Sequence, residues 1–397
     1  MSIFGRSSAI VALACSLYVV ALHAADEDIP APDEKSAAEI VAFIKQLGDE
    51  SYSAREDANE KILKYGLPAL KLVEAGTQDT DREIRYRCER LRIVLRDIDL
   101  QRRLEAFAAD VKGEKDHGLP AWDRFAELHG SGGSSRQLFV EIFRAEPDLL
   151  KSMQPDVKKS ADVVTTRVFQ LQQSLQVQQP ISFGSVAGLL FAGAEKEVAI
   201  SDQTQQMIFN FCYQASLTTA LADGAKKDVV RSLLAKYIVR GEGHVAYQGL
   251  NLAMQHDIKE GLEPARKLVK GRGAGQPHLL QMALLAMAKL GTEEDTEDML
   301  GLLDDKTVIM NFQINNQRIE CQVRDFALLS MLHLLVKNKE KVKGTALEGG
   351  DLKAFGFDRL EAQAQQLYSP QTIGFVSDEK RQEVFKKWEE VKGKLKK

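Results

Sequence analysis

The chain has few cysteines and prolines, and it lacks the short motifs of common enzyme and metal sites. Its 397 residues include 4 Cys and 10 Pro, which argues against a disulfide scaffold and against a proline-rich disordered chain. Cys-x-x-Cys, Cys-x-x-Cys-His, His-Glu-x-x-His and Gly-x-Ser-x-Gly are all absent from it. These absences remove the common zinc, c-type haem, zincin and hydrolase signatures. We therefore expect no catalytic residue, no metal site and no cofactor.

The charge balance shows no excess of basic residues. The formal net charge is −4, with 53 basic and 57 acidic side chains. The chain therefore lacks the excess of positive charge typical of nucleic-acid-binding proteins, and we expect no nucleic-acid partner. Three cysteines, Cys88, Cys212 and Cys321, lie far apart on apolar stripes. We expect them to be small buried side chains rather than a disulfide framework.

Three patterns are chemically suggestive, but each has a structural explanation. Residues 271–275 (GRGAG) are glycine-rich, yet no strand precedes them and no Gly-Lys-Ser/Thr follows, so an inter-helix loop is expected. His256-Asp257 is a pair also found in metal-dependent phosphohydrolases, but no further ligands can be located, and we expect a helix end. Asp81 and Arg85 are expected to cap a helix and to form hydrogen bonds between repeats.

Residues 48–97 predict a helical hairpin followed by a third helix. Ser53 and Glu56 have the spacing of a capping box at a helix start. Gly66 occurs where a residue with positive φ is favoured after a helix, and Pro68 suits the first turn of the next helix. Further apolar residues form one stripe in the second helix (Leu67, Leu70 and Val73) and another in the third (Ile84, Cys88, Leu91 and Leu95).

A helical hairpin cannot bury both faces of its helices, so it needs stacked neighbours. The segment 67–70 (LPAL), followed by Asp81, Ile84-Arg85 and Cys88, resembles a HEAT-type repeat. The opening at 47–56 and weaker patterns at 355–358, 374–375 and 387–389 are similar to uncharacterised secreted proteins common in planctomycete-type bacteria. The resemblance implies an all-α fold built as an irregular α-solenoid of HEAT-like helical hairpins. It transfers no catalytic residue.

The N-terminus has the pattern of a secretory signal peptide over residues 1–24. Arg6 precedes an apolar run from Ala9 to Leu22, and Ala24 precedes the acidic residues 26–28. The run is shorter than a comfortable membrane span. We expect cleavage near Ala24 and export to the periplasm or the extracellular space. An uncleaved anchor and a lipid attached at Cys15 are the alternatives.

Composition divides the rest of the chain into segments. The clearest break is 130–135 (GSGGSS). Before it, residues 118–122 (GLPAW) repeat the pattern of 66–70. After it, we expect one helix over 203–221 and a buried helix in the apolar stretch 181–194, whose alternative is a partner-binding patch. The predicted segments are an acidic leader (25–35), N-terminal HEAT-like repeats (36–129), a middle helical region (136–240), C-terminal HEAT-like repeats (241–360), and a tail with a capping helix (361–397).

One small β-hairpin is predicted within the C-terminal repeats, at 308–323. Apolar residues alternate in two runs on either side of Asn315-Asn316, and asparagine tolerates the positive φ of a type I′ turn. We expect the hairpin to pack on helices at 296–303 and 324–336. A two-residue turn would pair Phe312 with Ile319, Met310 with Cys321, and Val308 with Val323.

Together these patterns predict an exported, non-enzymatic scaffold that binds protein or peptide partners on a helical-repeat surface. The first alternative is an envelope-associated binding module for lipid or polysaccharide, which the basic C-terminal helix could contact. That helix could instead close the array with Trp388 buried. The second alternative is an enzyme with an unrecognised site in 136–240.

Overall fold

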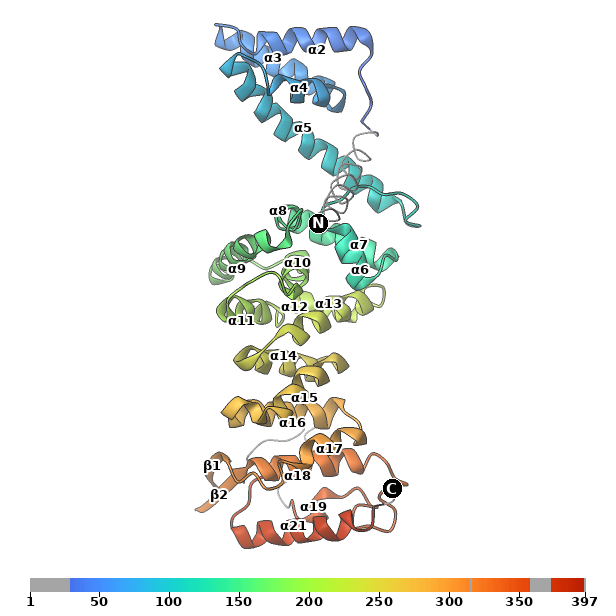
Figure 1. Ribbon diagram of the computed structural model, residues 1–397, viewed down its shortest axis with the longest axis vertical. Coiled ribbons are helices and arrows are strands. Elements are labelled where there is room, and N and C mark those ends of the chain that lie inside the picture. Colours follow the sequence, from blue (N-terminus) through green and yellow to red (C-terminus); the bar gives the residue numbers. More distant parts are fainter. Residues whose placement is uncertain (1–28, 315, 358–372, 396–397) are drawn as a thin grey trace, which may run out of the picture. The chain divides into compact units, whose positions relative to one another are not determined.

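The computed structural model describes residues 29–397, except 315, 358–372 and 396–397 (Figure 1). Of these residues, 68% are helical and 4% lie in strands. This composition confirms the prediction of a mostly helical protein with one small hairpin. The predicted signal peptide (1–24), part of the acidic leader and part of the C-terminal tail lie outside the described residues.

The chain forms two compact units, one ending at Glu141 and the other beginning at Ile142. Of the glycine- and serine-rich stretch predicted as a break, 130–132 lie between helices and 133–135 begin a helix. The first unit contains α2 (Glu34–Gln46), α3 (Tyr52–Tyr65), a 3₁₀ turn (Leu67–Ala69), α4 (Leu70–Gly76), α5 (Arg82–Ala109), α6 (Trp122–His129) and the first part of α7 (Gly133–Ala145).

The hairpin of α3 and α4 forms as the sequence predicts. Gly66 ends α3 with φ = +64°, and Pro68 lies in the 3₁₀ turn that starts the next helix. Asp81 caps α5, because its carboxylate accepts from the backbone N–H groups of Glu83 and Ile84 at 2.7 and 3.2 Å. The core of this unit includes the predicted stripe residues Leu70, Val73, Ile84, Cys88, Leu91 and Leu95, all buried, and Leu67 is partly buried against them. Ile40 and Ile44 of α2 and Ala58 and Ile62 of α3 complete this core.

The predicted capping box at Ser53 and Glu56 is wrong. Ser51 is the N-cap of α3, and the helix begins at Tyr52. Glu56 is then two residues beyond the position from which a side chain reaches the cap, and its carboxylate instead accepts from Arg87 of α5 at 2.9 Å. The glutamate therefore joins two helices rather than ending one.

Two arginines hold the loops before α3 and α5 in the same way. Arg55 Nη1 donates to the carbonyls of Asp49 and the next residue, at 2.7 and 3.0 Å. Arg85 Nη1 donates to the carbonyl of Asp79 and to the one after it, at 2.7 and 2.8 Å. Asp81 thus caps its helix as expected, whereas Arg85 bonds to the loop before its own helix and not between repeats. The same pair of bonds therefore recurs with a spacing of 30 residues.

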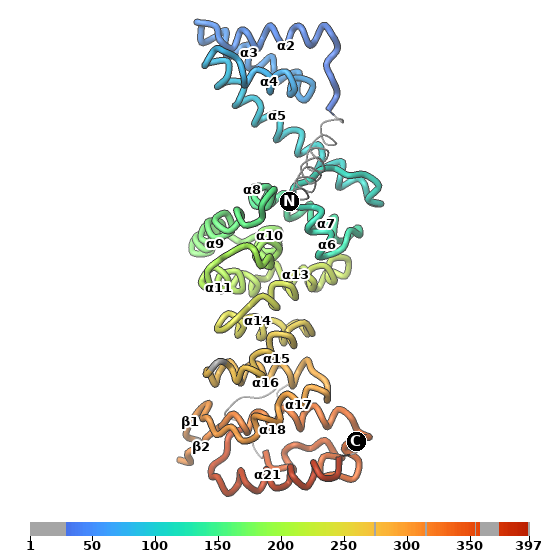
Figure 2. Tube along the Cα trace, viewed as in Figure 1, coloured from blue at the N-terminus to red at the C-terminus, as the bar shows by residue number. Residues whose placement is uncertain are grey.

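The second unit contains helices that follow one another in chain order (Figures 1 and 2). They are α8 (Pro147–Ser152), α9 (Ser160–Gln176), α10 (Phe183–Ala194), α11 (Asp202–Phe211), α12 (Ala215–Ala222), α13 (Lys227–Arg240), α14 (Gly243–Gln255), α15 (Leu262–Lys270), α16 (Pro277–Leu290), α17 (Thr296–Leu300), α18 (Val323–Leu335), α19 (Leu352–Phe355) and α21 (Asp378–Lys392), with 3₁₀ turns at Val157–Lys159, Lys259–Gly261, Arg272–Gly275 and Glu293–Asp295.

The middle of the chain differs from its prediction at one helix. The expected helix at 203–221 is divided into α11 and α12, because Gln214 has an extended backbone with ψ = 148°. The division lets α11 contact α9 and α14 while α12 contacts α10 and α13. The apolar stretch 181–194 forms α10, in which residues 183–193 are all buried. It is therefore the expected buried helix, and the alternative of a partner-binding patch is wrong.

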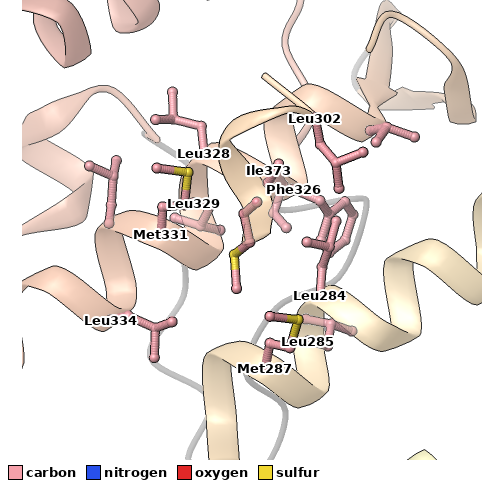
Figure 3. Close-up of a cluster of buried hydrophobic side chains, with 14 of the residues drawn as sticks. Leu284, Leu285, Met287, Leu302, Phe326, Leu328, Leu329, Met331, Leu334 and Ile373 are labelled. Atoms are coloured by element: carbon pink, nitrogen blue, oxygen red, sulfur yellow. The ribbon is translucent and has the colours of Figure 1, made fainter. Parts of the chain in front are cut away.

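A continuous apolar core joins α16, α18 and α21. Figure 3 shows its centre, where Leu284, Leu285 and Met287 of α16 lie near Phe326 and Leu329 of α18. From α21, the same core receives the buried side chains of Val384, Trp388 and Val391. The C-terminal helix thus has its apolar face occupied by the core, as the capping interpretation requires.

The hairpin forms with a two-residue turn, from β1 (Val308–Ile314) and β2 (Gln317–Gln322). Phe312 pairs with Ile319 and Met310 with Cys321, as predicted. The third predicted pair is wrong, because a bulge between Val308 and Met310 places Val308 opposite Gln322, and Val323 begins α18. The bulge turns Ile309 into the core and leaves Val308 39% exposed. The strands contact α18, which is the expected helix at 324–336, and α16, which takes the place of the expected helix at 296–303 as the second main contact.

Cys88, Cys212 and Cys321 are all buried, as predicted. Burial raises the pKa of Cys88 to about 11, so this thiol is unreactive at neutral pH. Within the described part of the chain, no helix has the length and apolar character needed to cross a membrane.

Candidate functional site

The outward face of β2 lines a cavity of about 400 Å³ in the second unit. Side chains alternate along a strand, so Ile319 and Cys321 enter the core while Arg318, Glu320 and Gln322 point to the opposite face. The cavity is completed by Lys306 before the hairpin, Arg324 at the start of α18, and the segment 375–378 with Arg381. We call it the hairpin cavity.

The far wall of the hairpin cavity is fixed to β2 by backbone pairing. Glu320 and Phe375 exchange two hydrogen bonds, of 3.0 Å from the Glu320 N–H and 2.9 Å from the Phe375 N–H. Gly374 permits this close approach, since a Cβ atom there would lie 2.8 Å from the Glu320 carbonyl oxygen. Ser377 then caps α21, accepting from the N–H of Lys380. The start of α21 is thereby held beside the polar face of the hairpin.

The two inner arginines of the cavity have their own counter-ions. Arg381 donates to Asp325 at 2.8 and 3.1 Å and to Asp378 at 2.9 Å. Arg324 donates to the same oxygen of Asp378 at 2.9 Å and to the side-chain oxygen of Gln322 at 2.6 Å. The hydrogen bond from Arg381 holds the pKa of Asp378 below its usual value. Asp378 is therefore ionised and serves as the shared counter-ion of both guanidinium groups.

The rim of the cavity carries positive charge without such close neutralisation. Lys306 is exposed, and Arg318 is 70% exposed, with the carboxylate of Glu320 at 3.9 Å. Four cationic and two anionic side chains line the cavity, an excess of two positive charges. Asp325, behind Arg381, reduces that excess to one. The arrangement favours an anionic group, because opposite charges attract most strongly where solvent is partly excluded.

A second, smaller hollow of about 140 Å³ lies in the first unit, between α3 and α5. Arg87 crosses its wall, donating to Glu83 at 2.7 Å and to Glu56 at 2.9 Å. Its apolar floor includes Leu91, which is buried, and Val94, which is 45% exposed. Glu56, Asn59 and Arg90 also line this groove, so its surface is polar as well as apolar.

The suggestive residues from the sequence do not assemble into a site. His256 ends α14, and its carbonyl accepts from Arg231 at 2.8 Å; burial lowers the pKa of this histidine. The glycine-rich 271–275 includes the 3₁₀ turn between α15 and α16. Over the residues that the structure describes, no group of three His, Cys, Asp or Glu side chains is placed to hold a metal ion.

The hairpin cavity was missed from the sequence because its two walls are separated by more than 50 residues. One pattern in the sequence does indicate a polar surface at this place. The positions of β2 that alternate with the apolar ones hold Arg318, Glu320 and Gln322, and Lys306 and Arg324 flank the hairpin. Such a polar face beside a buried one marks a surface that can line a site. Nothing in the sequence near residue 320 indicates that 375–381 would close it.

Comparisons with family models, with curated proteins and with solved structures found no match.

Proposed function

We propose that this protein is an exported, non-enzymatic scaffold whose hairpin cavity binds an acidic side chain of a protein or peptide partner. The observation that carries the proposal is the charge arrangement of the cavity. Arg324 and Arg381 are neutralised by Asp378 and Asp325, whereas the rim cations Lys306 and Arg318 face outward. Partner carboxylates would therefore meet the rim without displacing the inner ion pairs.

The architecture proposed with this function is an irregular α-solenoid of HEAT-like hairpins. Its support is the order of contacts in the second unit, where α13 contacts α14, α14 contacts α16, and α16 contacts α18. In such an array each element packs on its sequence neighbours, and a terminal element closes the apolar end. The closing element would be α21, through the buried Trp388.

An envelope-associated module is the second candidate, because anionic lipid or polysaccharide offers the same charge as an acidic peptide. The position of α21 disfavours lipid insertion by this helix. Its apolar stripe of Val384, Trp388 and Val391 is buried in the core, so only its charged faces are left to meet a surface. Amphipathic helices bind membranes chiefly by burying the apolar face.

The test uses the chain from residue 25 onward and two fluorescent peptides of equal length, one rich in Asp and Glu and one with the matching amides. Fluorescence anisotropy should show saturable binding of the acidic peptide alone, weakening as salt rises. The double variant Lys306→Gln/Arg318→Gln should weaken binding by about tenfold, on the order of 1.4 kcal/mol.

The matched control is Lys236→Gln/Lys259→Gln, which removes two exposed positive charges elsewhere in the same unit. It should bind like the unaltered protein. Equal weakening in both double variants would show a general charge effect and would overturn the assignment to the hairpin cavity. Retention on anionic vesicles or acidic polysaccharide, without peptide binding, would favour the envelope module.

A further inference from the structure

The outer edge of β1 carries main-chain groups that point away from β2. Glu320 of β2 exchanges two backbone hydrogen bonds with Phe375, so its N–H and C=O groups face away from β1. Asn311 lies directly opposite Glu320, and two opposite residues of an antiparallel pair either bond to each other or both point away. The N–H and C=O of Asn311 therefore point to the outer edge of β1. Those of Gln313, two residues further along the strand, do the same.

This edge is open within the part of the chain that the structure describes. Asn311 and Gln313 are both exposed, and among the described residues the backbone groups of neither one pair with a segment on that side. The strand Val308–Ile314 also contains no charged residue and no proline, the features that usually protect an edge strand from further pairing. It is therefore a template for another extended chain.

The two faces of β1 indicate which residues such a chain would contain. Asn311 and Gln313 lie opposite Glu320 and Arg318, so they share the face of the hairpin that lines the hairpin cavity. Phe312 lies on the other face and is only partly buried, which leaves apolar surface there. Neighbouring strands pair side chains of like character on each face. An added strand would therefore alternate polar residues on the cavity face with apolar residues beside Phe312.

The charge of the polar residues follows from Arg318. Its side chain is 70% exposed, and the carboxylate of Glu320 lies 3.9 Å from it. Neighbouring strands are about 4.8 Å apart, so the backbone of a strand added to β1 would lie about 10 Å from β2. An arginine and a glutamate that project from the same face span that distance together. A glutamate opposite Gln313 would thus reach the guanidinium across β1, which has no charge of its own to oppose it.

We propose that the acidic partner binds as an extended segment that adds a third strand to the outer edge of β1, with acidic and apolar residues in alternation. The inference rests on the proposed function and deepens it, because it states the conformation and the residue pattern of the partner. Main-chain hydrogen bonds to Asn311 and Gln313 would supply affinity. The two alternating sets of side chains would supply specificity.

The first test uses the unaltered chain from residue 25 onward and a fluorescent peptide, as long as β1, in which Glu and Val alternate. By fluorescence anisotropy it should bind more tightly than a peptide of the same composition with Glu and Val in separate blocks. Two further peptides carry N-methyl groups, one at every glutamate and the other at every valine. Successive N–H groups of a strand point to opposite sides. Only one of these two peptides should therefore lose affinity, by about tenfold or more.

The second test changes the edge itself. Asn311→Pro removes an outward N–H that does not bond to β2, and edge strands accept proline at such positions. It should weaken binding of the alternating peptide by about tenfold or more. The matched control is Asn311→Ala, which also deletes the amide side chain but keeps the N–H, so its affinity should stay within about twofold. Equal urea midpoints for the two variants would show that the second unit still folds.

The failure of this inference is distinguishable from failure of the proposed function. Equal affinity of the two N-methylated peptides, or of the two Asn311 variants, would overturn strand addition, whereas the hairpin cavity would stand if Lys306→Gln/Arg318→Gln still weakens binding. If that double variant binds normally, the proposed function fails and the inference fails with it. Dimerisation in sedimentation equilibrium that Asn311→Pro abolishes would show that a second copy of the chain occupies the edge, and would also overturn the inference.

Discussion

Arg381 of α21 and Asp325 of α18 form an ion pair that is almost entirely buried, with side chains 3% and 0% exposed. The guanidinium donates to both carboxylate oxygens, at 2.8 and 3.1 Å. Asp325 also accepts from the N–H of Gln322 at 2.9 Å, completing the cap of α18. Burial raises the pKa of Asp325, and Arg381 opposes that rise. The pair thus fixes the C-terminal helix, and one wall of the hairpin cavity, to the core.

Replacing Arg381 with Ala should destabilise the second unit strongly. Asp325 would then be a buried carboxylate without its counter-ion, a change that typically costs about 3–5 kcal/mol. Urea denaturation of the whole chain measures the effect. Arg318→Ala is the control, since Arg318 lines the same cavity but is 70% exposed, and its replacement should change the free energy of unfolding by about 0.5 kcal/mol or less. Similar midpoints for the two variants would contradict a structural role for the buried pair.

Leu91→Ala should destabilise the first unit far more than Arg92→Ala. Leu91 is 2% exposed within the core of α2–α5, so its truncation leaves a cavity and should cost about 2–5 kcal/mol. Arg92 has a side chain that is 38% exposed and paired with Glu89, so its loss should stay within about 0.5 kcal/mol. Thermal denaturation of both variants compares them directly, and equal losses would mean that the buried face of α5 is wrongly assigned.

The helices and their inward faces could be predicted because those depend on short-range patterns. The stripes of α5, the cap at Asp81 and the C-terminal burial of Trp388 all follow from spacing. The division of 203–221 into α11 and α12 could not be predicted, because it depends on tertiary contacts, of α11 with α9, α10 and α14 and of α12 with α10 and α13. The hairpin cavity was hidden for the same reason, since Glu320 meets Phe375 only through the fold.

Two glycines show how one sequence pattern can serve different physical needs. Gly66 and Gly261 begin similar segments, 66–70 and 261–265. Gly66 has φ = +64° and open space around it, so it is needed for its backbone conformation. Gly261 has φ = −60°, and a Cβ atom there would lie 2.5 Å from the Cβ of Ala253. Here glycine allows the 3₁₀ turn at 259–261 to approach α14 closely. The sequence pattern alone does not distinguish a glycine needed for close packing from one needed for a positive φ.

Acidification should weaken the second unit through His333. Burial, and then the charge of Lys337, lower the pKa of His333 to about 4. In the unfolded chain this histidine has its ordinary pKa of about 6.5. As the pH falls from 6.5 to 4, the unfolded chain therefore binds a proton that the folded chain does not. The contribution of the neutral His333 to the free energy of unfolding is therefore complete above pH 6.5 and declines below it. Allowing for partial exposure, the loss should be on the order of 1–2 kcal/mol.

His333→Gln removes this titration, and urea denaturation at pH 7.5 and pH 4.5 would reveal the difference. The unaltered protein should lose more stability between the two values than the variant does. Other carboxylates titrate in the same range in both proteins, so only the difference between the two losses reports on His333. An equal loss in both would show that the folded chain accommodates the protonated imidazole.

The turn of the hairpin tests how firmly its register is specified. Asn316 has φ = +63°, which asparagine tolerates, glycine adopts freely and a β-branched residue resists. Asn316→Gly should therefore keep or slightly raise stability, whereas Asn316→Val should cost about 1–2 kcal/mol. A two-stranded ribbon is marginal by itself, so the cost should appear first as local opening of 308–322 in hydrogen exchange. Because Arg318 lies two residues from the turn, the valine variant should also bind the acidic peptide more weakly than the glycine variant. If the two variants exchange and bind alike, the turn does not determine the position of β2, and the core contacts of Ile319 and Cys321 alone must hold it.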